Sequence, residues 1–169
     1  MRQSLLQYFG IWSIIQIKFV RRMLMKSQKA AEPDLPAIAR MAASMWRSHT
    51  AEELCDEFAR MLADPECGIF LLCADGQAVG FAQCGLRHDY VEGTSGSPVG
   101  YLEGIYVEPV YRHQGGAKHL LSACETWAKS MGCTEFASDC ELDNAASLQF
   151  HLNVGFSEAN RIICFTKKL

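Results

Sequence analysis

The sequence has no surplus of positive charge. Its 169 residues include 16 lysines and arginines against 19 aspartates and glutamates, which gives a formal net charge of −3. A protein that binds a nucleic-acid backbone needs a basic surface, because most of its affinity comes from neutralising phosphates. The composition therefore argues against a nucleic-acid partner, and a mildly acidic chain suits a cationic small molecule instead.

Paired cysteine motifs are also missing. There are eight cysteines, yet no two have the two-residue separation that is typical of zinc and thiol-redox sites. Several lie within apolar runs, where an unpaired cysteine acts as a small buried hydrophobe in a reducing compartment. We therefore expect no metal and a cytoplasmic location.

No apolar run is long enough to span a membrane, which takes about 20 residues. The run over residues 5–17 is too short, and its basic cluster (Lys18, Arg21 and Arg22) follows it, whereas a secretory signal has its positive charge first. We interpret residues 1–24 as an N-terminal extension that docks as a helix or frays, with an interfacial membrane helix as the alternative. No membrane partner is expected, and the domain covers residues 25–169.

No repeat and no linker rich in proline, glycine or serine divides the chain after residue 25, so we expect a single domain. Helical spacing predicts a first helix opened by Pro33, and a capping box of Thr50 and Glu53 begins a second. Two apolar runs, 69–74 and 78–85, flank Asp75-Gly76 and predict an antiparallel hairpin.

The remaining elements follow from turn residues and apolar spacing. We expect a loop over 89–98, a long strand over 99–107, a helix over 116–131, a short strand over 134–138, a helix opened by Asp143 or Asn144, and a last strand over 162–165. This order predicts an α/β fold with a mixed central β-sheet flanked by helices.

The segment after the long strand has the composition of an anion-binding cradle. Arg112 precedes Gly115, Gly116 and Ala117 in an R-x-x-G-x-A pattern, directly after a strand that ends in Val-x-Pro. Backbone N–H groups at a helix N-terminus are unpaired and partly positive, and glycines let a phosphate come close. Two glycines alone would indicate only a tight turn; the arginine and the strand favour a diphosphate site.

These residues resemble the acyl-CoA pyrophosphate loop of the GCN5-related N-acetyltransferase (GNAT) superfamily, and the element order is similar to that fold across residues 26–169. A second motif agrees, because Asn144 precedes a helix that ends in Gly155-Phe156. The resemblance implies that acetyl-CoA is the cosubstrate and that its acetyl group moves to a primary amine. It assigns the following residues to acetyl-CoA: Ile105, Tyr106, Val107, Arg112, His113, Gln114, Gly115, Gly116, Ala117, Lys118 and Asn144.

One position departs from the superfamily pattern. His151 stands four residues before Gly155, where many relatives have a tyrosine that is proposed to protonate the leaving thiolate. Histidine donates protons near neutral pH, so His151 is a candidate catalytic residue. The alternative is a helix histidine that only packs or caps.

Within the superfamily the sequence is most similar to aminoglycoside 6'-N-acetyltransferases. Four runs carry this likeness, over residues 87–93, 97–99, 101–107 and 137–139. The resemblance implies a polycationic aminoglycoside acceptor, antibiotic resistance and a homodimer. It assigns these residues to the acceptor: Trp46, Tyr90, Glu103, Asp139 and Asn160. The last is an asparagine where relatives tend to have an acid.

The chemistry of such an acceptor explains these residue types. Carboxylates pair with ammonium groups and aromatic faces attract cations. The reacting ammonium must lose a proton before attack, so Glu103 or Asp139 is a candidate base, and we expect the catalytic set to be Glu103, Asp139 and His151. Two other functions stay open: acetylation of another amine, such as a polyamine or a protein N-terminus, and a non-catalytic acyl-CoA-binding module.

Overall fold

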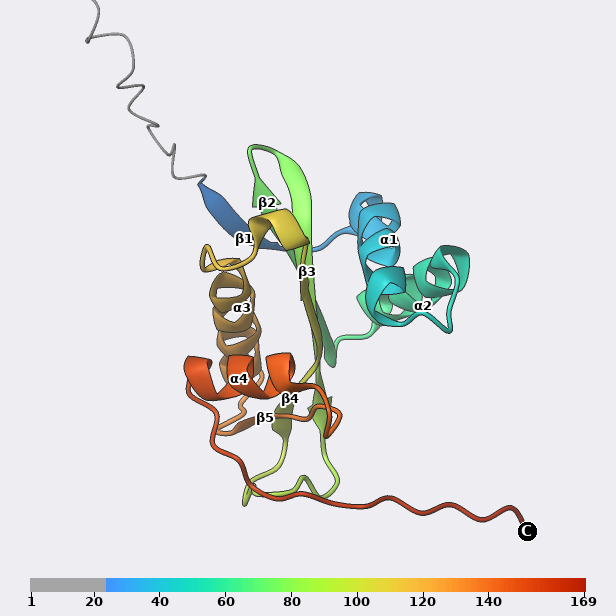
Figure 1. Cartoon of the computed structure of the whole chain (residues 1–169), viewed down its shortest axis with the longest axis vertical. Coiled ribbons are helices and arrows are strands. Elements are labelled where there is room, and N and C mark those ends of the chain that lie inside the picture. The colour runs from blue at the N-terminus through green and yellow to red at the C-terminus, as the bar shows by residue number, and fades with distance from the viewer. Residues whose placement is uncertain (1–23) are drawn as a thin grey trace, which may run out of the picture.

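The computed structural model describes residues 24–169, which form one mixed five-stranded sheet with helices on both faces (Figure 1). The strands stand in the order β1 (Met25–Lys29), β2 (Cys67–Ala74), β3 (Gln77–Arg87), β4 (Val99–Val107) and β5 (Phe136–Ser138). The first four are antiparallel to their neighbours, and β5 is parallel to β4. The predicted mixed α/β sheet is confirmed.

The β2–β3 hairpin forms where the sequence predicts it. Asp75 (φ 48°) and Gly76 (φ 80°) both adopt left-handed conformations, as a two-residue type I′ turn requires. Strand β1 was not predicted, because its sequence is mostly polar and lacks alternation. It becomes a strand because the edge of β2 offers a row of unpaired backbone groups, and Met25 pairs there with Ala74.

Helices α1 (Leu35–Met45) and α2 (Ala51–Ala63) cover one face of the sheet. The predicted capping box begins α2: the Glu53 N–H donates to Thr50 Oγ1 at 3.2 Å, and the Thr50 N–H donates to Glu53 Oε2 at 2.8 Å. The core on this side includes Phe58 and Phe81, whose ring centroids are 5.6 Å apart in an edge-to-face arrangement.

Helices α3 (Gly116–Ser130) and α4 (Ala145–Val154) lie on the other face (Figure 1). A Cβ at Gly116 would come within 2.5 Å of Leu72 Cδ2, so this glycine lets the start of α3 sit directly on β2. Asn144 caps α4 by accepting a hydrogen bond from the Ser147 N–H at 3.0 Å. Both helices start within a residue or two of the predicted positions.

The predicted last strand over residues 162–165 is wrong. Residues 156–169 form neither helix nor strand, and Figure 1 shows this C-terminal tail leaving the rest of the molecule. Its apolar side chains are uncovered, with Ile162, Ile163 and Phe165 exposed by 68%, 81% and 92%. A strand needs a sheet edge to pair with, and within one copy of residues 24–169 the tail pairs with none.

Candidate functional site

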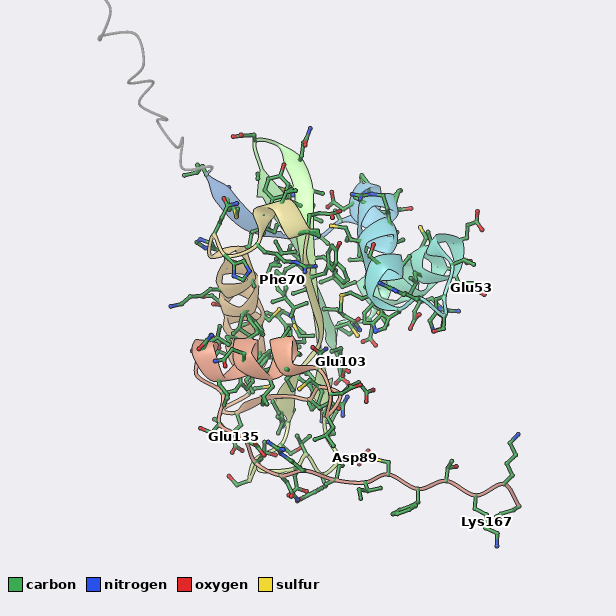
Figure 2. The ribbon with its side chains drawn as sticks, in the orientation of Figure 1. Glu53, Phe70, Asp89, Glu103, Glu135 and Lys167 are labelled. Carbon is green, nitrogen blue, oxygen red and sulfur yellow. The ribbon has the colours of Figure 1, made fainter. Side chains whose placement is uncertain are left out.

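A β-bulge in β4 presents Glu103. Gln83 of β3 pairs with Gly104 and the next residue, Cys84, pairs with Leu102, so Glu103 has no partner across the ladder. Such an extra residue bends the strand and re-aims its side chain, and bulges are frequent beside active sites. Glu103 is the one exposed residue of β4, and Figure 2 shows it between the two helix layers.

The Glu103 carboxylate is paired with Arg87 at the end of β3. Arg87 Nη2 donates to both carboxylate oxygens, at 2.9 and 3.0 Å, and Nε donates to Oε1 at 3.2 Å. The guanidinium also stacks on Tyr101, with its carbon 3.4 Å from the ring centroid. Gly85 faces Tyr101 across the ladder, so no side chain at that position obstructs the arginine. Arg87 is therefore held by a ring and by a carboxylate.

Tyr101 connects this pair to Asp139. Burial raises the pKa of Tyr101 to about 12, and the nearby negative charge of Asp139 adds to the rise, while the positive charge of Arg87 opposes it. In the parallel β4–β5 pair Tyr101 lies opposite Ala137, so Asp139 follows the end of β5 beside the bulge. Two residues predicted for substrate binding, Glu103 and Asp139, are thus brought together on one face of the sheet.

Trp46 belongs to the same region. It follows α1 and is half-buried, and a Cβ at Gly104 would lie 3.0 Å from its ring carbons Cη2 and Cζ2. The other side of the indole packs near Phe58 and Phe81, with centroid distances of 6.3 Å. The tryptophan is therefore both a core residue and a wall next to the bulge.

Tyr90 and Asn160 form a separate cluster around Glu92. The Tyr90 hydroxyl donates to Glu92 Oε2 at 2.9 Å, and Asn160 Nδ2 donates to Glu92 Oε1 at 3.2 Å. Tyr90 lies on the β3–β4 loop and Asn160 on the tail. Glu135 anchors this loop, because its carboxylate accepts from the Ser95 and Gly96 N–H groups; these backbone hydrogen bonds hold the pKa of Glu135 below its usual value.

The predicted anion cradle occupies the other end of β4. A 3-10 turn (Pro109–Tyr111) leads to Arg112, whose Nε donates to the Val107 carbonyl at 2.8 Å. His113 (φ 59°) and Gly115 (φ 88°) are left-handed, and α3 begins directly afterwards. Successive N–H groups in this kind of turn form a concave anion site at the positive end of the helix.

His151 on α4 uses both ring nitrogens. Nδ1 is 2.7 Å from the Ser147 carbonyl oxygen and Nε2 is 2.9 Å from Ser138 Oγ on β5. Because a carbonyl only accepts, Nδ1 carries a hydrogen. The ring also lies between Phe150 and Phe156, at centroid distances of 5.3 and 5.1 Å. His151 therefore connects α4 to the sheet.

The family model of the acetyltransferase (GNAT) family matches residues 35–156. The chain belongs to this family. An aminoglycoside N(6')-acetyltransferase type 1 from Stenotrophomonas maltophilia is 40% identical over 84% of this chain and 92% of its own length. One from Acinetobacter haemolyticus is 39% identical over 86% of this chain and 99% of its own length.

Solved structures of aminoglycoside acetyltransferases are similar to this chain in fold and in sequence. The aminoglycoside N-acetyltransferase AAC(6')-Iy in complex with CoA is 34% identical, with a TM-score of 0.84, covering 87% of this chain and 97% of that chain. Another structure of that enzyme contains the bisubstrate analog CoA-S-monomethyl-acetylneamine and matches with a TM-score of 0.83 over 86% of this chain and 99% of that chain, again at 34% identity.

The GNAT cradle of this chain is open beside Gly115. No heavy atom lies within 4 Å of the place that a Cβ of Gly115 would occupy, whereas the Leu72 side chain fills the corresponding space at Gly116. The first glycine thus keeps the mouth of the cradle open, and the second packs the helix. In residues 24–169 no group of three histidine, cysteine or acidic side chains is placed to hold a metal ion, and no helix there is long and apolar enough to cross a membrane.

Four residues of this GNAT site were not singled out from the sequence: Arg87, Glu92, Tyr101 and Ser138. All four lie in the runs that carry the likeness to aminoglycoside acetyltransferases. Tyr101 and Glu103 show the spacing of two side chains on one face of a strand, which was a usable signal. The Arg87–Glu103 pairing was not predictable, because it depends on the bulge.

Proposed function

We propose that this chain transfers an acetyl group from acetyl-CoA to the 6'-amino group of an aminoglycoside and thereby confers antibiotic resistance. The observation that carries the proposal is the placement of the acidic bulge and the anion cradle along one strand. Glu103 and Val107 both lie on β4, which puts them about 13 Å apart at roughly 3.3 Å per residue. Relatives of this chain at 40% and 39% identity are aminoglycoside N(6')-acetyltransferases, which supports the acceptor class.

Acetyl-CoA supplies the acetyl group when bound. The residues proposed to hold it are the backbone of Ile105, Tyr106 and Val107, the cradle over residues 112–118, and Asn144. The open space at Gly115 and the N-terminus of α3 support the cradle assignment. Because Asn144 Oδ1 caps α4, its side-chain amide nitrogen is the group proposed to donate to the pantetheine arm.

Glu103 and Asp139 are proposed to hold the cationic acceptor, with Asp139 as the proton acceptor. The charge of Glu103 is already compensated by Arg87, whereas the carboxylate of Asp139 lies near the neutral Tyr101 hydroxyl. An uncompensated carboxylate accepts a proton from an ammonium more readily. Glu103 then orients the amine with the lone pairs that Arg87 leaves unused.

Aromatic and amide groups complete the proposed acceptor site. Trp46 provides an apolar wall next to the bulge. Tyr90 and Asn160 contribute through Glu92, whose carboxylate binds both side chains. Glu92 supplies a negative charge 3.2 Å from the Asn160 amide nitrogen, at a position where the resemblance implies an acid.

His151 is proposed as the proton donor for the leaving group. When the ring is cationic, Nε2 donates its proton to Ser138 Oγ at 2.9 Å while the serine hydroxyl gives its own proton to the leaving thiolate, which leaves a neutral imidazole and a neutral serine. Ser138 lies against β4, 3.0 Å from the Leu102 carbonyl oxygen. His151→Gln should lower kcat, and His151→Tyr, which introduces the residue that many relatives have, should retain it. Equal kcat in His151→Gln and the wild type would leave His151 with a packing role only.

A homodimer is proposed as the functional state. The support is the tail: its apolar residues 162–165 have strand-like composition but are uncovered, and a second copy offers a surface to pair with. Ile163→Asp together with Phe165→Asp should convert a dimer to a monomer in light scattering. A wild-type monomer at micromolar concentration would exclude this arrangement.

Residues 1–24 are proposed to be an extension that chemistry does not need. Positions 1–23 lie outside the described residues, and every site residue named above comes after Met25. A chain starting at Met25 should keep the wild-type kcat. A cytoplasmic location is also proposed, and the eight free cysteines support it.

The decisive experiment measures CoA release with four acceptors. Kanamycin should be turned over, whereas an aminoglycoside with a hydroxyl in place of the 6'-amine, spermidine and a peptide amine should not. Turnover of spermidine or the peptide alone would move the chain to another GNAT activity. Binding of acetyl-CoA without turnover of any amine would indicate a non-catalytic module.

A further inference from the structure

The Arg87–Glu103 pair poses a chemical problem for an enzyme that binds cations. The carboxylate that faces the acceptor is already bonded to a permanent positive charge through three contacts of 2.9 to 3.2 Å. Both side chains remain accessible, with 43% and 34% of their surfaces exposed, so a substrate reaches them. An arginine at this point weakens the attraction of the site for an ammonium group.

That weakening has a use, because the reacting amine must be neutral when it attacks. Two uncompensated carboxylates beside an amine would stabilise its ammonium form and raise the amine's pKa. With Arg87 in place, the charges of Arg87, Glu103 and Asp139 sum to one negative charge for one incoming ammonium. Loss of the amine's proton is then less costly.

We propose that Arg87 is a positioning residue that fixes the Glu103 carboxylate at the bulge and compensates its charge, so that the acceptor amine is held without over-stabilising its unreactive cation. This proposal rests on the proposed aminoglycoside acetyltransferase function. Stacking on Tyr101, with the guanidinium carbon 3.4 Å from the ring centroid, keeps the arginine from swinging away when substrate arrives. Arginine suits this role because its planar fork bonds a carboxylate and stacks on a ring at once.

Titratable groups face this pair from each neighbouring element. Tyr101 lies beneath the guanidinium on β4 and Asp139 follows β5. The Cys67 thiol on β2 is close enough to interact with the Glu103 charge. His88, next to Arg87, is bonded to Glu66 at 3.0 Å. The test must therefore separate the charge of Arg87 from these neighbours, which a change at Arg87 alone achieves.

The experiment compares Arg87→Gln, Arg87→Lys and the wild type in the full chain, with kanamycin as acceptor across pH 6 to 9.5. Arg87→Gln should lower the acceptor KM by about three- to tenfold, because the ammonium is held more tightly, and should lower kcat at neutral pH. Its kcat should recover as pH rises, with the alkaline shift of the rate profile about one pH unit. Arg87→Lys keeps the charge, so its profile should stay within a few tenths of the wild type.

Two controls separate charge compensation from folding. In a Glu103→Gln background the Arg87→Gln change should no longer shift the pH profile, because the carboxylate whose charge Arg87 compensates is absent. Arg40 is another exposed arginine, paired with the Glu108 carboxylate at 2.9 Å. Arg40→Gln breaks that pair and should leave the acceptor KM and the pH profile unchanged. Thermal unfolding of each variant confirms that it is folded.

The outcomes are distinct. A raised acceptor KM with an unshifted profile in Arg87→Gln would overturn the proposal and reduce Arg87 to a structural residue. Equal profile shifts in Arg87→Gln and Arg87→Lys would also overturn it, because geometry rather than charge would then be responsible. No turnover of kanamycin by the wild type would instead refute the proposed function, and the role of Arg87 with it.

Discussion

Gly115 and Gly132 adopt nearly the same backbone conformation at the two ends of α3, with φ values of 88° and 89°. A Cβ at either position would have no heavy atom within 4 Å. Replacement by valine therefore imposes a similar left-handed strain at both sites, and its Cβ meets no neighbouring atom at either. Only Gly115 belongs to the cradle, so the pair isolates the effect of blocking it.

The expected cost to folding is alike for the two variants. Holding a non-glycine residue in the left-handed region costs roughly 1–2 kcal/mol, which lowers Tm by about 4 °C for a chain of this size. Gly115→Val should in addition raise the acetyl-CoA KM by about tenfold to a hundredfold, because loss of one charge-assisted hydrogen bond is worth roughly 1.5–3 kcal/mol.

The assay follows CoA release at saturating kanamycin while acetyl-CoA is varied, and calorimetry gives the CoA affinity directly. Gly132→Val should have a Tm that is lower than that of the wild type, by about as much as in Gly115→Val, but a wild-type acetyl-CoA KM. If both variants raise the acetyl-CoA KM equally, backbone strain explains the effect. If neither does, residues 113–118 do not bind the diphosphate.

Three further predictions concern the loop, the thiols and Tyr101. Glu135→Gln should raise the acceptor KM about threefold or more without changing the acetyl-CoA KM, since the carboxylate anchors the Tyr90 loop through the Ser95 and Gly96 N–H groups; an unchanged acceptor KM would refute this. Because the pKa of Glu135 lies below its usual 4.5, the anchor should persist above that pH and fail only as pH falls further. Timed alkylation read by mass spectrometry should label the two exposed cysteines, Cys140 and Cys164, first, and a third thiol reacting as fast would contradict the burial pattern. The raised pKa of Tyr101, about 12 against 10, predicts stability that is fully present below pH 10 and lost as pH rises through 12; urea unfolding of Tyr101→Phe should show a smaller alkaline loss, and an equal loss would refute the assignment.

The parts of the fold that were predicted are those with local causes. The Asp75-Gly76 turn, the Thr50 capping box and the strand β4 each depend on neighbouring residues, whose conformational preferences act at short range. The anion cradle is of the same kind, because its left-handed glycine and helix start occupy one continuous segment. Sequence alone therefore predicted the left-handed turn and helix start of the cradle and singled out Glu103 at the bulge.

Tertiary structure decided the rest. Strand β1 has no sequence signal and exists because β2 offers it an edge, whereas residues 162–165 have the signal of a strand and lack an edge to pair with. The extra residue in β4 turns Glu103 toward Arg87, which comes from a different strand, and so decides which carboxylate carries a compensated charge. Pairing across a sheet depends on register between distant segments, and register is set by how the whole sheet packs.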